Sequence, residues 1–377
     1  MNRFSVYKSD NYNNIYPVVK KHFEAHNIMS EIPADAHVLI KPNLVTDKDA
    51  AFSVTTNPDF VYAIAEYLCE NGIKKITVAD CPGGALLLFS QMSDVFDRCG
   101  FSSLSEIAIL NTDFESSDIP CPEGFSNKKF NIINAVANAD YVINVPKLKT
   151  HNQTGITAGV KNIFGCIPGL QKPEFHAKYP KSEDFSNMLV ELAATVKPDF
   201  TIVDAIEIME GNGPTNGKKR HLGLTFAGKN IFGLDKFIAD YLDIPPDSIT
   251  TISAAEKKGW NPKEYSVIGE KDFSLTEPIL LPEYIKASSF SGKIHAKIKT
   301  LFTRVNDSLF MSYPLMNKKC TQCCKCVLTC PQKALTNKEK KITLDIEKCI
   351  GCLCCDEVCP NAAVDIKRKF KKRKTRK

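Results

Sequence analysis

Ten of the 15 cysteines lie between residues 320 and 359, and their spacing carries the clearest chemistry in the sequence. Eight of them form two copies of the pattern C-x2-C-x2-C-x3-C-P, with the second copy 29 residues after the first. These eight are Cys320, Cys323, Cys326 and Cys330, followed by Cys349, Cys352, Cys355 and Cys359. Three thiolates separated by two residues each can wrap around three corners of one iron–sulfur cubane, while the fourth reaches a second cubane. The sequence therefore predicts two [4Fe-4S] clusters.

Because the fourth cysteine of each copy ligates the other cluster, the pattern also predicts which thiolates share a cluster. One cluster is expected on Cys320, Cys323, Cys326 and Cys359. The other is expected on Cys349, Cys352, Cys355 and Cys330. Each cluster would then tie the two copies together, as a structural metal does in a small domain.

A pair of zinc sites is the alternative for so many cysteines. Zinc modules usually combine two C-x2-C pairs with a loop between them, often with histidine, and no histidine follows His295. The grouping of three cysteines and then one before a proline favours iron–sulfur clusters. Cys324 and Cys354 stand outside the pattern, and we expect them to be bystanders, with cluster isomers that use them as the alternative.

Residues 317–366 are therefore predicted to form a small α+β domain of the two-[4Fe-4S] ferredoxin type. This segment holds eight lysines and six acidic residues, unlike small acidic ferredoxins. Its docking surface for a redox partner protein is expected to differ accordingly.

A second set of candidate residues follows predicted strands in the first 290 residues. Ligands bind at the carboxyl ends of strands in open α/β sheets, and Lys41, Asp80, Lys147, Lys149, His151 and Asp204 all follow such strands. As candidate catalytic residues we name Lys147, Lys149, His151 and Asp204: the lysines, with Lys161, to bind a small anionic substrate, and His151 or Asp204 to handle protons. Taken singly, each has a simpler interpretation as a solvated lysine, a structural histidine or a capping aspartate.

The elements that would position these residues alternate between strands and helices. Predicted strands span 37–40, 75–79, 107–110, 141–145, 200–203, 222–226 and 265–268, and predicted helices span 15–28, 58–71, 184–196, 232–242 and 248–258. Asn57-Pro58 is a typical helix start, with a capping side chain and a proline at the first position. The alternation predicts an α/β domain over residues 1–290, with a mostly parallel sheet flanked by helices.

Residues 291–316 place Ile294, Ile298, Leu301 and Val305 on one helical face, which predicts an amphipathic connecting helix. A helix that binds a membrane surface or a partner is the alternative. Residues 367–377 carry nine Lys and Arg and no acid, and they are predicted to form a disordered basic tail. If the tail has a target, it would be an anionic membrane, RNA or an acidic protein.

The formal charge of +6 belongs to this tail, because the remaining chain has 40 basic and 43 acidic residues. A nearly neutral body argues against nucleic-acid binding by the whole protein. The sequence has neither a signal-peptide pattern at Met1–Asn14 nor an apolar run long enough for a transmembrane helix. We therefore expect a soluble, cytoplasmic protein in which the cysteines serve metal binding.

Five ordered runs resemble a single family. They are KPNLV (41–45), ADCPGG (79–84), NVPKLKTH (144–151), TGITAGVKNIFG (154–165) and DAIEIMEGNGP (204–214). These runs are similar to the bacterial and archaeal family catalogued as domain of unknown function 362, whose members often carry a C-terminal double [4Fe-4S] module. The resemblance covers residues 1–366 and implies an iron–sulfur protein, usually of anaerobes, with no established reaction. It also implies a distant likeness to the nickel-dependent lactate racemase fold, and fold alone does not fix function.

Two functions remain open at this point. The first is an electron-transfer protein or redox enzyme, an oxidoreductase in the second case, whose two clusters relay electrons between a partner and a pocket in the α/β domain. The second is a non-catalytic binding or scaffold protein, whose clusters are structural or sense oxygen.

Overall fold

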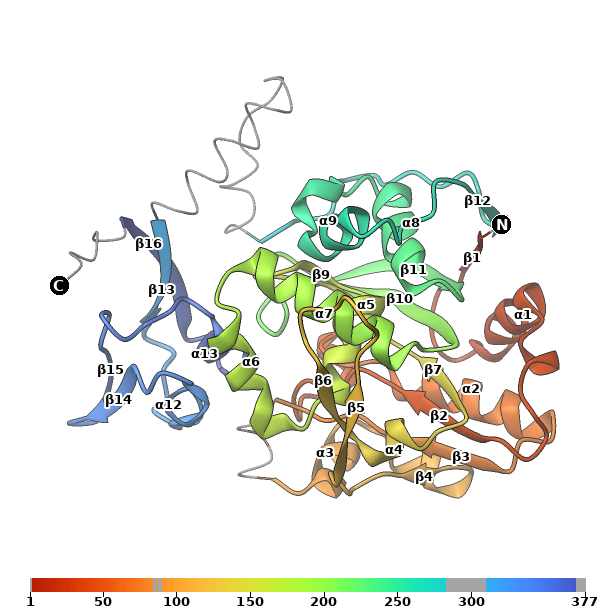
Figure 1. Ribbon diagram of the computed structural model, residues 1–377, viewed down its shortest axis with the longest axis horizontal. Coiled ribbons are helices and arrows are strands. Elements are labelled where there is room, and N and C mark those ends of the chain that lie inside the picture. The colour runs from red at the N-terminus through yellow and green to blue at the C-terminus, as the bar shows by residue number, and fades with distance from the viewer. Residues whose placement is uncertain (1, 84–85, 87–89, 283–309, 371–377) are drawn as a thin grey trace.

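A ten-stranded sheet forms the centre of residues 2–282, here called the large domain (Figure 1). The computed structural model describes residues 2–83, 86, 90–282 and 310–370. Along the sheet the order is β12 (Tyr265–Gly269), β1 (Asn2–Lys8), β11 (Lys218–Gly228), β10 (Phe200–Glu210), β7 (Tyr141–Asn144), β2 (His37–Lys41), β3 (Lys75–Val78) and β4 (Ile109–Leu110). β8 (Lys147–His151) pairs with β10, and β9 (Gly155–Thr157) pairs with β8. Most pairs are parallel, and β11 runs antiparallel to both of its neighbours.

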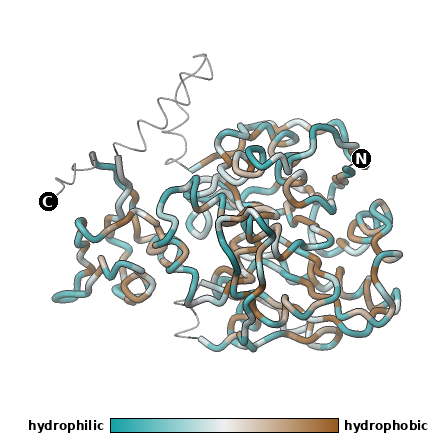
Figure 2. Tube along the Cα trace, in the orientation of Figure 1, coloured by the Kyte–Doolittle hydropathy of each residue, from teal (hydrophilic) through white to brown (hydrophobic). Residues whose placement is uncertain are grey.

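Helices cover both faces of this sheet. On one face lie α1 (Tyr16–His26), α2 (Pro58–Glu70) and α3 (Met92–Arg98); α5 (Gly159–Asn162), α7 (Ser182–Val196), α8 (Ile231–Tyr241) and α9 (Thr250–Lys257) lie on the other. Strand β2 shows why both faces need cover: Val38 and Ile40 join the core under α1 and α2, and Leu39 joins the core under α7. Buried parallel strands are apolar on both sides for this reason, and the apolar residues gather in the interior (Figure 2). The prediction of an α/β domain with a mostly parallel sheet is confirmed.

Local signals explain individual boundaries. The Asn57 side chain accepts a hydrogen bond from the Asp59 backbone N–H at 2.8 Å, and Pro58 is the first residue of α2. Gly72 adopts a φ of 89° just after this helix, a conformation that glycine allows at little cost. Three shorter elements pack on the face that carries α7: α4 (Asn134–Ala137) and the hairpin of β5 (Ser116–Pro120) and β6 (Lys129–Ile133).

The cysteine module, here residues 310–370, is a small α+β unit. It contains β13 (Phe310–Met316), α12 (Lys325–Thr329), β14 (Leu335–Lys338), β15 (Lys341–Leu344), α13 (Cys354–Glu357) and β16 (Val364–Phe370). β13 pairs antiparallel with β16, and β14 with β15. The module packs beside α6 (Lys172–Lys178) of the large domain (Figure 1).

Two of the predicted segment boundaries in this region differ from the structure. Residues 291–309 of the predicted connecting helix lie outside the described residues, and 310–316 form strand β13. Pro314 explains the difference, because proline lacks the N–H that a helix interior needs. Residues 367–370, assigned to the basic tail, continue strand β16, in which Lys367 pairs with Tyr313. Residues 371–377 lie outside the described residues.

Two strands of the large domain differ from the prediction. No element was predicted for residues 2–8, which form β1 between β11 and β12. Strand β10 continues to Glu210 past a register shift between Ala205 and Glu207, so Asp204 lies inside the strand and not after it.

Two buried histidines beneath β1 predict how stability depends on pH. Ser5 Oγ lies 2.7 Å from Nδ1 of His22 and 2.9 Å from Nε2 of His26, and both rings are buried. Burial, with Lys229 and Arg3 nearby, lowers the pKa of His26 to about 4, and burial lowers the pKa of His22 as well. Below about pH 6.5, the ordinary pKa of histidine, the unfolded chain therefore binds protons at these two residues, and the folded chain does not.

We expect the free energy of unfolding of the large domain to fall as pH drops from about 6.5 to about 4. The fall of the His26 pKa from about 6.5 to about 4 corresponds by itself to about 3 kcal/mol. Urea unfolding followed by the fluorescence of Trp260, the single tryptophan, measures this effect. The variant His26→Gln should flatten the dependence, and an equally steep loss in that variant would show that other groups cause it.

Candidate functional site

The carboxyl ends of β2 and β3 meet in a buried ion pair. Lys41 Nζ donates to Asp80 Oδ1 at 2.8 Å, and the Leu44 backbone N–H donates to Asp80 Oδ2 at 2.6 Å. Gly165 lies so close that a Cβ there would overlap Asp80 Oδ1. Protein groups therefore neutralise both charges of this pair. Residue 165 must be glycine, because the backbone there approaches Asp80 too closely for any side chain.

Asparagines join this pair to the segment that carries Lys161. Asn162 Nδ2 donates to Asn144 Oδ1 at 2.8 Å, and Asn43 Nδ2 donates to Asn162 Oδ1 at 2.7 Å. On the other side, the Asp235 carboxylate accepts from the backbone N–H groups of Gly159 and Val160 at 2.7 and 3.1 Å. Because both ends of α5 are held, Lys161 has a defined position between them.

Lys147 and Asp204 form a second buried pair. Lys147 Nζ donates to Asp204 Oδ2 at 2.8 Å, and the Tyr12 hydroxyl donates to Asp204 Oδ1 at 2.8 Å. The Asn57 backbone N–H gives Oδ2 a further hydrogen bond at 3.0 Å, and both charged side chains are at most 1% exposed. Burial lowers the pKa of Lys147, while Asp204 raises it. The carboxylate is saturated, and neither residue lines a cavity described below.

Lys149 and His151 follow on the same strand and point to different partners. Lys149 is buried, and its Nζ donates to the Val54 carbonyl at 2.5 Å. His151 Nδ1 accepts from the backbone N–H of Gln153 at 3.1 Å, which leaves the ring proton on Nε2. That Nε2 lies 3.1 Å from Oε1 of Glu357, without the alignment of a hydrogen bond. His151 therefore meets the cysteine module directly.

Helix α13 of the cysteine module docks onto the large domain through two acidic residues. Asp356 accepts from Asn152 Nδ2 at 2.7 Å and from Asn216 Nδ2 at 3.2 Å. Thr215 Oγ1 donates to the Glu357 carbonyl at 3.2 Å. Burial alone would raise the pKa of Glu357, but His151 and Lys161 lower it below its usual range. Glu357 is therefore an anion at neutral pH, held between the two parts of the chain.

A cavity of about 580 Å³, here called the interface cavity, lies where the large domain meets α13. The large domain contributes Asp80, Lys161, Phe164, Lys172 and His176, among others. The cysteine module contributes Thr329, Cys354, Glu357 and Val358. Of the sequence-predicted site residues, the structure thus brings Lys161 to the cavity, holds His151 against Glu357 in its wall, and keeps Lys147 and Asp204 apart from it.

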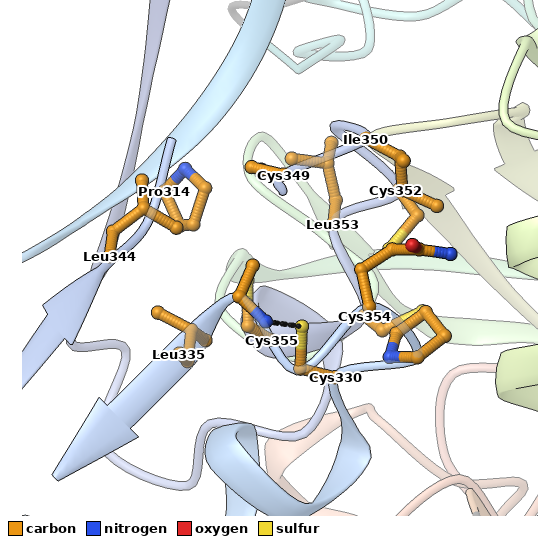
Figure 3. A pocket seen from close by; sticks show the side chains of 13 residues that line it. Pro314, Cys330, Leu335, Leu344, Cys349, Ile350, Cys352, Leu353, Cys354 and Cys355 are labelled. Carbon is orange, nitrogen blue, oxygen red and sulfur yellow. Dashed lines mark hydrogen bonds between the residues drawn. The ribbon is translucent and has the colours of Figure 1, made fainter. Parts of the chain in front are cut away.

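The eight patterned cysteines surround two smaller cavities. The first cysteine cavity, about 320 Å³, is lined by Cys320, Cys323, Cys326 and Cys359. The second cysteine cavity, about 350 Å³, is lined by Cys330, Cys349, Cys352 and Cys355 (Figure 3). Cys324 lines the first and Cys354 the second, and Cys354 also lines the interface cavity. Among the described residues, no three Cys, His, Asp or Glu side chains converge closely enough to hold a single metal ion.

Backbone groups face the sulfur atoms in matching positions of the two copies. The Ala334 N–H donates to Cys330 Sγ at 3.2 Å (Figure 3), and the Ala363 N–H donates to Cys359 Sγ at 3.2 Å. Thiolate sulfurs accept such bonds in iron–sulfur sites, where they tune the reduction potential. Four thiols around each cavity, with an N–H donor to one of them, form a donor set that fits a [4Fe-4S] cluster.

Sequence reasoning missed three residues of the interface cavity: Lys172, His176 and Glu357. Lys172 and His176 lie on α6, which the sequence did not predict, and Glu357 lies in the four-residue helix α13. The only signal was the position of Glu357 inside a cysteine pattern, where an acidic residue has no part in ligation.

The described part of the chain contains no helix with the length and apolar character needed to cross a membrane.

Comparison with known proteins places this architecture in a family. A protein of Synechocystis sp. (strain ATCC 27184 / PCC 6803 / Kazusa), thylakoid-associated protein sll1697, is 36% identical over 256 residues, which cover 65% of this chain and 74% of that protein. The lactate racemase apoprotein from Thermoanaerobacterium thermosaccharolyticum aligns with a TM-score of 0.41 and 12% identity, over 65% of this chain and 57% of that chain. Residues 38–240 match the family model described as "Domain of unknown function (DUF362)". The chain therefore belongs to the DUF362 family.

Proposed function

We propose that this protein is an iron–sulfur electron-transfer protein or redox enzyme. In this function, electrons pass between an external partner protein and a molecule in the interface cavity. The observation that carries the proposal is the position of Cys354, whose side chain lines both the second cysteine cavity and the interface cavity. The second cysteine cavity and the interface cavity therefore share Cys354 as a lining residue.

The residues that would hold the clusters are the eight patterned cysteines, four in each cysteine cavity. Bound [4Fe-4S] clusters would supply reversible one-electron transfer. The protein's part is to exclude water, hold the thiols and donate the N–H groups of Ala334 and Ala363 to sulfur. The likeness of the two sites is what the internal duplication of the sequence would produce.

The two cysteine cavities differ in their surroundings, and this difference suggests the direction in which electrons would pass through the module. Both are lined only by cysteine-module residues, but Cys354 of the second also lines the interface cavity, whereas Cys323 in the wall of the first is exposed. Lys318 and Lys319 precede it on the surface. A redox partner with an acidic surface would dock at the first cysteine cavity. Electrons would then pass from the second cysteine cavity to the molecule in the interface cavity.

Groups of the chain could also supply a proton at the interface. His151 carries its proton on Nε2, and the ring faces the Glu357 carboxylate at 3.1 Å. Burial, with Lys161 nearby, lowers the pKa of His151, so its neutral form prevails. In the proposed function, His151 holds a proton at Nε2 and Glu357 faces it across the domain boundary, whereas Lys147 and Asp204 keep β8 and β10 in place.

The full chain, purified and reconstituted without oxygen, tests this function. We expect about eight iron atoms and eight sulfides per chain, the content of two [4Fe-4S] clusters, and visible absorption that dithionite bleaches reversibly. Bound zinc in place of iron would contradict the cluster assignment. Clusters that cannot be reduced and reoxidised without losing iron would favour a non-catalytic role, in which they are structural or sense oxygen.

A further inference from the structure

Positive charge exceeds negative charge around the interface cavity. Lys172 Nζ donates to the carbonyl of Pro82 at 3.2 Å and to that of Cys81, and it forms no ion pair within the part of the chain that the structure describes. Lys161 makes no hydrogen bond or ion pair with any residue that the structure describes; its Nζ lies 5.0 Å from the centre of the Phe164 ring. Lys41 and Asp80 neutralise each other. The wall therefore carries two ammonium groups without a carboxylate partner among the described residues, those of Lys161 and Lys172, against the single carboxylate of Glu357.

His176 in the same wall has a buried ring nitrogen. The ring is 2% exposed, and its Nδ1 is buried without a hydrogen-bond partner among the residues that the structure describes. It stacks on Phe185 with ring centres 4.4 Å apart and meets the edge of Phe164. Buried polar groups in proteins are almost always hydrogen-bonded. A buried histidine nitrogen of this kind, on a residue that lines a cavity, therefore points to a ligand that supplies a partner.

The rest of the cavity wall is mostly apolar. Leu44, Val45, Phe164, Pro173 and Val358 all contribute to it. No arginine is found among the described residues that line the cavity, so the planar fork that favours bidentate phosphate recognition is missing. Lysine charges beside an apolar wall suit a molecule with an anionic end and a carbon body.

We propose that the interface cavity binds a small organic carboxylate, with its carboxylate between Lys161 and Lys172, within reach of His176, and its carbon body against the apolar wall. The inference rests on the proposed function, because it names the class of molecule that would exchange electrons at that cavity. Binding itself requires no electron transfer. The site is composite, since Glu357 and Cys354 of the cysteine module close it.

The electrostatics of Lys161 agree with this assignment. Burial lowers the pKa of Lys161, Glu357 opposes the shift, and Lys172 and Lys41 lower the pKa further. An anion beside Lys161 would offset both burial and repulsion. A ligand carboxylate would therefore add negative charge that Glu357 alone does not provide.

The test is calorimetric titration of the full, cluster-loaded chain in its oxidised state, without oxygen and at low ionic strength. The probes are pyruvate, succinate, inorganic phosphate and, as an uncharged analogue, succinamide. We expect at least one carboxylate to bind, and Lys161→Gln to weaken it at least about tenfold, since losing one partner of a desolvated charge pair costs at least that much. Lys161→Arg keeps the charge and should restore most of the affinity.

Lys181→Gln is the matched control, because it removes one exposed positive charge just beyond α6. It should leave binding unchanged. Absence of carboxylate binding, binding that Lys161→Gln leaves intact, binding as tight to succinamide, or binding of phosphate alone would overturn the inference. Circular dichroism identifies a variant that fails to fold. If Lys161→Gln fails, Lys172→Gln, which removes the other ammonium group of the wall, should weaken binding in its place, and unchanged binding in that variant would overturn the inference.

Iron content and reversible reduction are measured on the same samples. If these succeed and no carboxylate binds, the inference fails and the proposed function stands. If carboxylate binds in a Lys161-dependent way but the clusters cannot be reduced and reoxidised, the proposed function fails and the binding site stands.

Discussion

Replacing Cys330 with serine should remove the cluster expected on Cys349, Cys352 and Cys355 and spare the other. Cys330 lies between α12 and β14, 19 residues before Cys349, yet it lines the second cysteine cavity and not the first. Iron per chain should fall to about half, from two [4Fe-4S] clusters to one. Iron analysis and electron paramagnetic resonance of the reduced protein measure the loss, because coupling between two neighbouring clusters would vanish with one of them.

Cys324→Ser is the control for this experiment. Cys324 lines the first cysteine cavity, but its Sγ takes part in hydrogen bonds with Gln322 O at 3.3 Å and Asn337 Nδ2 at 3.2 Å. Its replacement should leave the iron content unchanged. If Cys330→Ser instead lost the cluster expected on Cys320, Cys323 and Cys326, the crossover would be wrong.

The same variant should also weaken the cysteine module. The apolar core of the module contains few buried side chains: Cys326, Leu335, Ile342, Cys355 and Val364. A core of this size rarely supports a fold without a metal or disulfide. Proteolysis of Cys330→Ser should therefore cut within residues 310–370 faster than in the parent protein, while the large domain resists as before.

The second large effect is expected from Asp204→Ala. The substitution leaves the Lys147 ammonium buried without its carboxylate, and it also removes the acceptor of the Tyr12 hydroxyl and of the Asn57 N–H. Breaking a buried ion pair in this way costs about 3–5 kcal/mol. Urea unfolding followed by Trp260 fluorescence measures the loss.

Two further variants make this result interpretable. Lys147→Met combined with Asp204→Leu removes both charges and should recover much of the stability, since a buried pair replaced by apolar groups is often close to neutral. Lys219→Ala removes an exposed partner of Glu207 and should change stability by less than about 1 kcal/mol. A loss below about 1 kcal/mol in Asp204→Ala would mean that water reaches the pair.

Local signals predicted much of the fold. Helix α2 was predicted because Asn57 and Pro58 act on the first turn, where neighbouring residues decide the outcome. Strand β2 was predicted because burial on both faces makes it apolar throughout. Strand β1 was missed because its partners β11 and β12 lie more than 200 residues away, and its alternating residues carry too little apolar character to predict it alone.

The candidate site was only partly predictable, for a physical reason. Sequence placed polar groups at strand ends, and Lys161 does reach the interface cavity. It could not tell that Lys147 and Asp204 neutralise each other, because Asp204 faces Lys147 across a pairing of β8 with β10. Nor could it place Glu357 against His151, since that contact joins residues about 200 positions apart through packing of a separate module.

The pairing of β13 with β16 has a consequence for how such chains arise. Phe310 lies opposite Phe370, so the chain enters and leaves the cysteine module at one point. A unit whose ends meet can be inserted into a longer chain, or removed from it, without disturbing the fold on either side. What fits this unit to its host is the four-residue helix α13, whose Asp356 and Glu357 meet Asn152, Asn216 and His151. A module of this kind can therefore be transferred between chains as one unit, and changes at very few positions fit it to a new host domain.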